Sequence, residues 1–283
     1  MNVAQNFRFT PISENSGVMH RKMMSDLAEK VRKDSLSSGF PSELRAEAIF
    51  KSHGWSVTGN LYFIDQDENK GREIDLRAYT NFNNTEIEPV VFCWSLLSAE
   101  VKKSVKPWVI FTSPRGMFEN NTHRKLAHMH NTSGHLETKL QKLHPSMSMP
   151  RIGRTSQVAF SHDTSTIFSS VVGATKAAID DHKAAEEHGE IWSDDSIDAV
   201  IYEPIVILDG PLFECYIEAG ELITEQASVI QYGLHYASPN YKHEQYFVDI
   251  VTLDYLEIYL KKKEEWLSIL HDYLLIKNSG KKA

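Results

Sequence analysis

The apolar run VVFCWSLL, residues 90–97, is the feature that most constrains this chain. It is far too short to span a bilayer and is typical of a strand buried in a sheet. It leads directly into SAEVKKS, which carries Glu100, Lys102 and Lys103. A charged side chain is costly to bury unless it is paired, bound to a metal or part of a site. The run therefore predicts a buried strand that ends in a functional site.

The segments before this run predict a helix and two further strands. Ser42 follows a proline and can act as the N-cap of the helix, and Gly54 can end it. The segment DQDENKG is typical of a hairpin turn, and NFNNTE separates the next two strands. The elements expected here are the helix 43–54 and the strands 55–65, 72–80 and 88–102.

The rest of the chain alternates between strand and helix patterns. Residues 1–40 predict a helical extension, with helical spacing over 19–33 and a loop over 35–40. Residues 114–164 are rich in His, Asn, Ser and basic residues, and we expect long loops with one helix over 138–143. The remaining expected elements are a strand at 107–113, a helix at 165–187, strands at 199–208, 212–218 and 245–252, and a helix at 254–276. The pattern predicts one α/β domain over 41–283, with a mixed central sheet flanked by helices.

Side-chain alternation places two of the charged residues together. Residues two apart in a strand point to the same side, so Glu100 and Lys102 share a face. In REIDLRAYT, Asp75 lies on the face opposite to Ile74 and Leu76. If these two strands are neighbours, Asp75 and Glu100 meet, and their mutual repulsion calls for a cation between them. Mg²⁺ suits oxygen ligands, and Lys102 beside it can orient or help to deprotonate a water molecule.

The order of Glu47 on a helix, Asp75 on a strand and Glu100-Val101-Lys102 on the next strand resembles the PD-(D/E)xK nuclease superfamily. The resemblance implies a restriction-endonuclease-like core, which would map onto 43–112 and 165–208. It further implies that Asp75, Glu100 and the Val101 carbonyl hold the metal, that Lys102 is the catalytic lysine and that Glu47 supports them. The chain departs from the pattern in having Ile74 in place of a proline before the aspartate. It also carries the insertion 114–164 and, over 209–276, additional C-terminal strands and a helix.

Charge is unevenly spread along the chain. The formal net charge is −8, yet the segment from Glu100 to Thr155 holds ten Lys and Arg against three Glu and no Asp. A local basic face can hold phosphates on an acidic protein because salt confines the field of each patch to about 8–10 Å. A solvated surface stretch is the alternative interpretation of this composition. The residues expected to contact nucleic acid are Lys103, Lys106, Arg115, Arg124 and Lys125.

The histidines of the insertion offer a different metal site. His128 and His130, with His123, His135 or His144, could bind Zn²⁺ through their imidazoles. No cysteine accompanies them, and their spacing matches no standard zinc finger. Histidines at the surface or facing nucleic acid are the alternative interpretation.

The two cysteines lie in apolar, strand-like contexts, and no secretory signal or membrane segment is evident, so we expect a reduced, cytoplasmic protein without a membrane partner. The residues and the resemblance together imply a metal-dependent endonuclease that acts on DNA with Mg²⁺ or Mn²⁺, with RNA left open. A role in restriction or in defence against foreign DNA, and a homodimer, are expectations from the resemblance alone. For the acidic stretch 178–225 we expect either a surface that faces a partner protein or one that keeps the chain soluble. The alternative is a catalytically inactive module on the same fold that binds nucleic acid or protein.

Overall fold

The computed structural model describes residues 14–84, 90–116, 119, 126–130, 144–145, 149–161, 165–187, 196–241 and 244–279. The chain divides into two compact units, Met1–Pro41 and Ser42–Ala283. The first unit holds helix α1 (Glu14–Ser37), which runs further in both directions than the spacing over 19–33 predicts and includes part of the expected loop. No helix in the described residues is long and apolar enough to cross a membrane.

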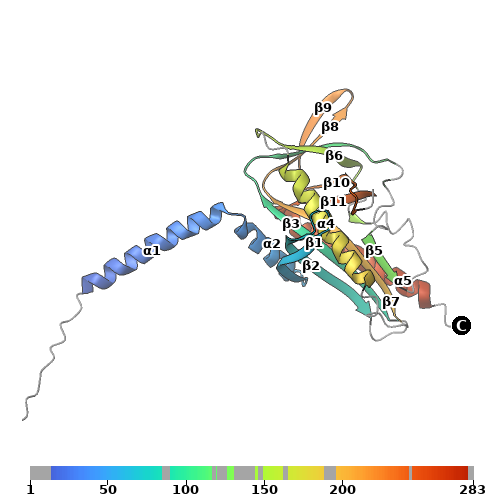
Figure 1. The fold of residues 1–283 in the computed structure, drawn as a ribbon, viewed down its shortest axis with the longest axis horizontal. Coiled ribbons are helices and arrows are strands. Elements are labelled where there is room, and N and C mark those ends of the chain that lie inside the picture. The colour runs from blue at the N-terminus through green and yellow to red at the C-terminus, as the bar shows by residue number, and fades with distance from the viewer. Residues whose placement is uncertain are drawn as a thin grey trace, which may run out of the picture. The chain divides into compact units, whose positions relative to one another are not determined.

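The second unit is built on one large mixed sheet of eleven strands within the described residues (Figure 1). The strand order is β1-β2-β3-β7-β11-β10-β6-β4-β8-β9, and β5 pairs with β7. The strands are β1 (Ser56–Asp65), β2 (Lys70–Asn84), β3 (Val91–Lys103), β4 (Trp108–Pro114), β5 (Ala127–His130), β6 (Arg151–Val158), β7 (Ile197–Asp209), β8 (Leu212–Glu218), β9 (Glu221–Ala227), β10 (Val229–Tyr236) and β11 (Glu244–Thr252).

Strand β3 lies between two partners of opposite direction. It pairs antiparallel with β2, which in turn forms an antiparallel hairpin with β1. On its other side it pairs parallel with β7 from Val91↔Ile197 to Lys103↔Asp209. Strand β7 is buried along almost all of its length, as expected for a strand with neighbours on both edges and cover on both faces. The apolar run 90–97 is therefore an inner strand, as its sequence predicts.

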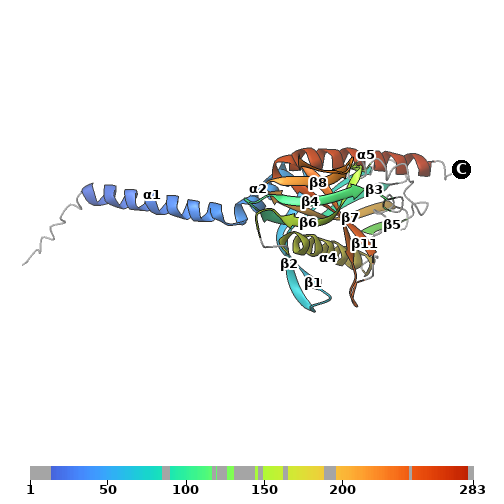
Figure 2. The ribbon, with the colours of Figure 1, turned by 90° about the horizontal axis from the view of Figure 1, so that it is seen from above.

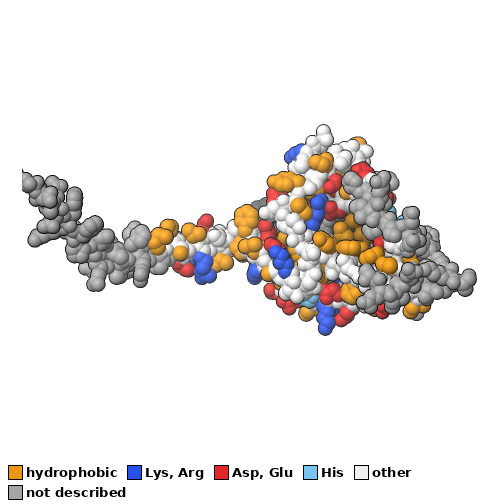
Figure 3. All heavy atoms as spheres, turned by 90° about the horizontal axis from the view of Figure 1, so that it is seen from below, with side chains coloured by type: hydrophobic (Ala, Val, Ile, Leu, Met, Phe, Trp, Pro, Cys, Tyr) orange, Lys and Arg blue, Asp and Glu red, His pale blue; other side chains and the backbone are white. Residues whose placement is uncertain are grey.

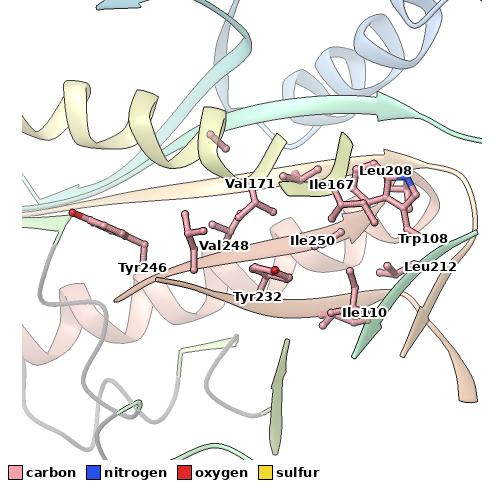
Figure 4. Packing of buried hydrophobic residues seen from close by; sticks show 14 of the residues in the cluster. Trp108, Ile110, Ile167, Val171, Leu208, Leu212, Tyr232, Tyr246, Val248 and Ile250 are labelled. Carbon is pink, nitrogen blue, oxygen red and sulfur yellow. The ribbon is translucent and has the colours of Figure 1, made fainter. Parts of the chain in front are cut away.

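Helices cover both faces of this sheet (Figure 2). Helix α4 (Thr166–Glu187) packs Ile167 and Val171 against Tyr232 of β10 and Ile250 of β11 (Figure 4). Helix α2 (Phe40–Ser52) and helix α5 (Leu256–Ser279) join another core cluster, in which Phe50 lies with strand residues of β2, β3 and β7. A short 3₁₀ turn, Leu253–Tyr255, leads into α5. The two packed layers fix β3 in place from both sides.

The predicted α/β class, the mixed sheet flanked by helices and the long C-terminal helix are confirmed. The expected strands before residue 114 correspond to β1, β2, β3 and β4 within a few residues. Gly54 ends α2, with a φ of 78° that favours glycine. The prediction that Ser42 is an N-cap is wrong, since α2 begins at Phe40 and the Ser42 hydroxyl instead donates to Asp209 at 2.5 Å.

Strands β5, β6, β9 and β10 are not predicted by the sequence pattern. Strands β5 and β6 lie inside the insertion 114–164, where only loops and a helix over 138–143 were expected; that helix lies outside the described residues. The sequence of β6 does not show the apolar alternation typical of a strand, because it contains Gly153 and several polar residues. A Cβ added to Gly153 would lie 2.7 Å from Ile110 Cγ2, so the close approach of β4 requires glycine here.

Candidate active site

Asp75 and Glu100 lie side by side on neighbouring strands. Leu76 of β2 pairs with Ala99 of β3, and this antiparallel register brings Asp75 level with Glu100. The Val101 backbone N–H donates to Asp75 Oδ2 at 2.7 Å. The aspartate carboxylate is thus fixed directly to the strand that carries Glu100 and Lys102.

The Lys102 ammonium lies between the two carboxylates. Its Nζ is 3.0 Å from Asp75 Oδ2 and 2.5 Å from Glu100 Oε2. The side chains are 33% exposed for Lys102, 20% for Asp75 and 13% for Glu100. Partial burial weakens screening by water, so the three groups act as one electrostatic unit. The structure therefore brings together three of the four side chains that the sequence assigns to catalysis.

Burial and charge shift the pKa values of two of these groups. Burial raises the pKa of the Glu100 carboxyl, with a further contribution from the charge of Asp75, while Lys102 acts in the opposite direction. Burial alone would lower the pKa of Lys102, but Glu100 and Asp75 outweigh it and raise the pKa above its ordinary value. Lys102 consequently remains protonated at neutral pH.

Helix α2 carries a glutamate, Glu43, that is influenced by the charges of this cluster. Burial raises the pKa of Glu43, and the charge of Asp75 adds to that effect while Lys102 opposes it. Glu47 lies one turn later and forms an ion pair with Lys51 on the same helix. Glu43, which the sequence does not single out, is thus an α2 carboxylate that interacts electrostatically with Asp75 and Lys102. It was missed because both glutamates lie on the same helix face, four residues apart, and the sequence alone does not say which one reaches the sheet.

A pocket of about 250 Å³ opens beside Glu100 and Lys102. Helix α4 closes one side of it with Ser169, Ser170 and Gly173, and its other lining residues are Phe63, Arg72, Glu73, Glu100 and Lys102. A Cβ added to Gly173 would lie 2.9 Å from Glu100 Oε1. A larger residue there would force the glutamate to move, so Gly173 makes room for the carboxylate. Neither Gly173 nor Arg72 is predicted from the sequence to belong to the site.

The basic residues expected to contact phosphate lie in different surroundings. Lys103 is exposed at the end of β3, and Lys106 is exposed and donates to the Phe160 carbonyl at 2.9 Å. Arg115 is half-buried and donates to Gln231 Oε1 at 2.6 Å, so it makes a hydrogen bond within the protein. Arg124 and Lys125 lie outside the described residues. On the face drawn in Figure 3, the visible Lys and Arg side chains are scattered among acidic ones.

The histidines considered for zinc are spread over separate places. His144 is fully buried, where its Nε2 lies 2.9 Å from both Lys263 Nζ and Glu203 Oε1. His128 and His130 belong to β5, and His123 and His135 lie outside the described residues. In the described part of the chain, no three or more His, Cys, Asp or Glu side chains form a group that could hold a metal ion. His144 instead helps to join α5 to the sheet.

Comparison of the chain with protein-family models, with curated proteins and with solved structures finds no match.

The raised pKa of Glu100 predicts how stability depends on pH. The folded state binds the Glu100 proton more tightly than the unfolded state, whose carboxyl titrates near the ordinary value of 4.5. This stabilising contribution is complete below that value and is lost as the pH rises through the folded pKa. We expect the free energy of unfolding of the wild type, relative to Glu100→Gln, to fall as the pH rises from 4.5 toward neutrality. Urea denaturation at several pH values measures the difference, and a constant or rising difference would contradict the burial of Glu100.

Proposed function

We propose that this protein is a metal-dependent nuclease that hydrolyses phosphodiester bonds of DNA. The observation that carries the proposal is the convergence of Asp75 Oδ2 and Glu100 Oε2 on one positive centre at the end of β3. The sequence of elements supports it. Helix α2, the antiparallel strands β1, β2 and β3, helix α4 and the parallel strand β7 occur in the order that the resemblance to PD-(D/E)xK nucleases implies, with β4, β5 and β6 inserted before α4.

The side chains present fit Mg²⁺ or Mn²⁺. Asp75 and Glu100 supply hard carboxylate oxygens, the ligands such ions prefer, and both already contact the same cationic group. In the proposal, Asp75, Glu100 and the Val101 carbonyl hold the metal. When bound, such an ion lowers the pKa of water and offsets the charge of a phosphate group.

Lys102 has an electrostatic role in this proposal. With its pKa raised by the two carboxylates, it keeps its proton at neutral pH and is a poor general base. We therefore assign it to orienting a water molecule and to stabilising negative charge on the reacting phosphate. Glu43 acts from α2 by adding negative charge beside Asp75 and Lys102.

One observation favours the alternative of a catalytically inactive binding module. The Lys102 ammonium contacts both carboxylates, so each of them has a cationic partner without a metal. A module that binds nucleic acid or protein on this fold would keep the cluster for stability alone.

Cleavage of supercoiled plasmid in Mg²⁺ separates the two candidates. We expect Asp75→Asn, Glu100→Gln and Lys102→Met each to lower the cleavage rate about a hundredfold or more, because each removes a charge that acts on the reacting groups. Glu221→Gln, an exposed change on β9, serves as the matched control and should cleave like the wild type. EDTA should stop the reaction. Cleavage unchanged in the three variants would indicate a contaminating nuclease. DNA binding without cleavage by the folded wild type would support the binding module.

The two glutamates of α2 provide a second test. We expect Glu43→Gln to lower the cleavage rate about tenfold, because it removes a charge that acts on Asp75 and Lys102. Glu47→Gln removes only an ion pair with Lys51 and should change the rate less than about twofold. Rates from the same plasmid assay compare the two variants. A larger loss in Glu47→Gln would instead support the assignment made from the sequence.

A further inference from the structure

The pocket beside the catalytic cluster contains a second cation, Arg72. Its side chain is 44% exposed, and it lines the same pocket as Glu100 and Lys102. Burial raises the pKa of Glu100, and Arg72 is among the cations that oppose this effect. Its charge therefore reaches the reacting region. Both cations that line the pocket pair with two carboxylates, but Arg72 is the more exposed of the two, and one of its partners, Glu68, is itself exposed.

The guanidinium of Arg72 is positioned by an ion pair with a buried aspartate. Its Nε lies 2.9 Å from Asp65 Oδ2, and the Asp65 side chain is only 1% exposed. Asp65 Oδ1 in turn accepts from Lys176 of α4 at 2.8 Å. A buried aspartate with two cationic partners is a rigid support, so the planar fork of Arg72 is oriented before any ligand arrives.

The same guanidinium also contacts an exposed carboxylate. Arg72 Nη2 forms an ion pair with Glu68, which lies in the turn between β1 and β2 and is 38% exposed. Glu68 also pairs with Lys70 at 2.6 Å, so it keeps a cationic partner if it leaves Arg72. An exposed pair of this kind contributes little stability, so a phosphate, which also forms charge-assisted hydrogen bonds with arginine, can displace the carboxylate.

We propose that Arg72 binds a backbone phosphate of the nucleic acid, and that Glu68 occupies its guanidinium in the free protein until the phosphate displaces it. The inference rests on the proposed function, because it supplies the phosphate contact that a nuclease site requires. It assigns Asp65 as the positioning residue of that contact and makes Glu68 an internal competitor of the substrate.

Two variants that break the same ion pair should change DNA binding in opposite directions. Binding of a short fluorescein-labelled DNA duplex is followed by fluorescence anisotropy in Ca²⁺, with the DNA checked by gel for cleavage. We expect Arg72→Gln to weaken binding about tenfold and to lower the slope of log K against log salt by about one, as for loss of one phosphate contact. We expect Glu68→Gln to strengthen binding about threefold, and Glu221→Gln, which removes an equal charge elsewhere, to leave it unchanged.

A structural role of the ion pair would affect both variants in the same sense, so the opposite signs are diagnostic. Weaker binding in both variants, or an Arg72→Gln protein with the affinity and salt slope of the wild type, would overturn this inference and leave the proposed function standing. A wild-type protein that binds no DNA at any salt concentration would overturn both. Thermal unfolding of each variant verifies that the protein tested is folded.

Discussion

The ammonium of Lys102 between Asp75 and Glu100 is the interaction on which the interpretation of this protein depends. Its geometry follows from strand register, because a slip of one residue between β2 and β3 would turn Asp75 to the opposite face. That register is held by a buried sheet in which β3 has partners on both edges and helices on both faces. Partial burial of three charges is costly, and mutual pairing offsets the cost.

The helices around this cluster contribute space and charge to it. Gly173 of α4 leaves space for the Glu100 carboxylate, and Glu43 of α2 adds a further negative charge. Helix α2 is itself held at the end of β7, where Ser42 and Arg45 both bind Asp209. The pocket lies where the carboxyl end of β3 meets helix α4 and the hairpin of β1 and β2, so a few side chains from these elements create a charged, partly buried site.

The sequence is sufficient to predict the arrangement of Asp75, Glu100 and Lys102. Side-chain alternation fixes the face of each residue, and strands that are consecutive in the chain pair with each other. The sequence does not distinguish Glu43 from Glu47, since the choice depends on how α2 packs against the sheet. Strands such as β6 and β9 are polar and partly exposed, so their signal is weak until the partner strands are known. The sequence also does not predict that Arg115 hydrogen-bonds to Gln231 inside the protein, because it is one of many basic residues in its segment.

Binding of Mn²⁺, followed by the loss of its free electron paramagnetic resonance signal, tests most directly whether Asp75 and Glu100 share a divalent ion. The wild type should bind Mn²⁺, and both Asp75→Asn and Glu100→Gln should weaken that binding strongly. Lys102→Met should preserve or strengthen it, because the ammonium competes for the same two oxygens. A wild type that binds no Mn²⁺, or binding that is unaffected by loss of either carboxylate, would contradict the account.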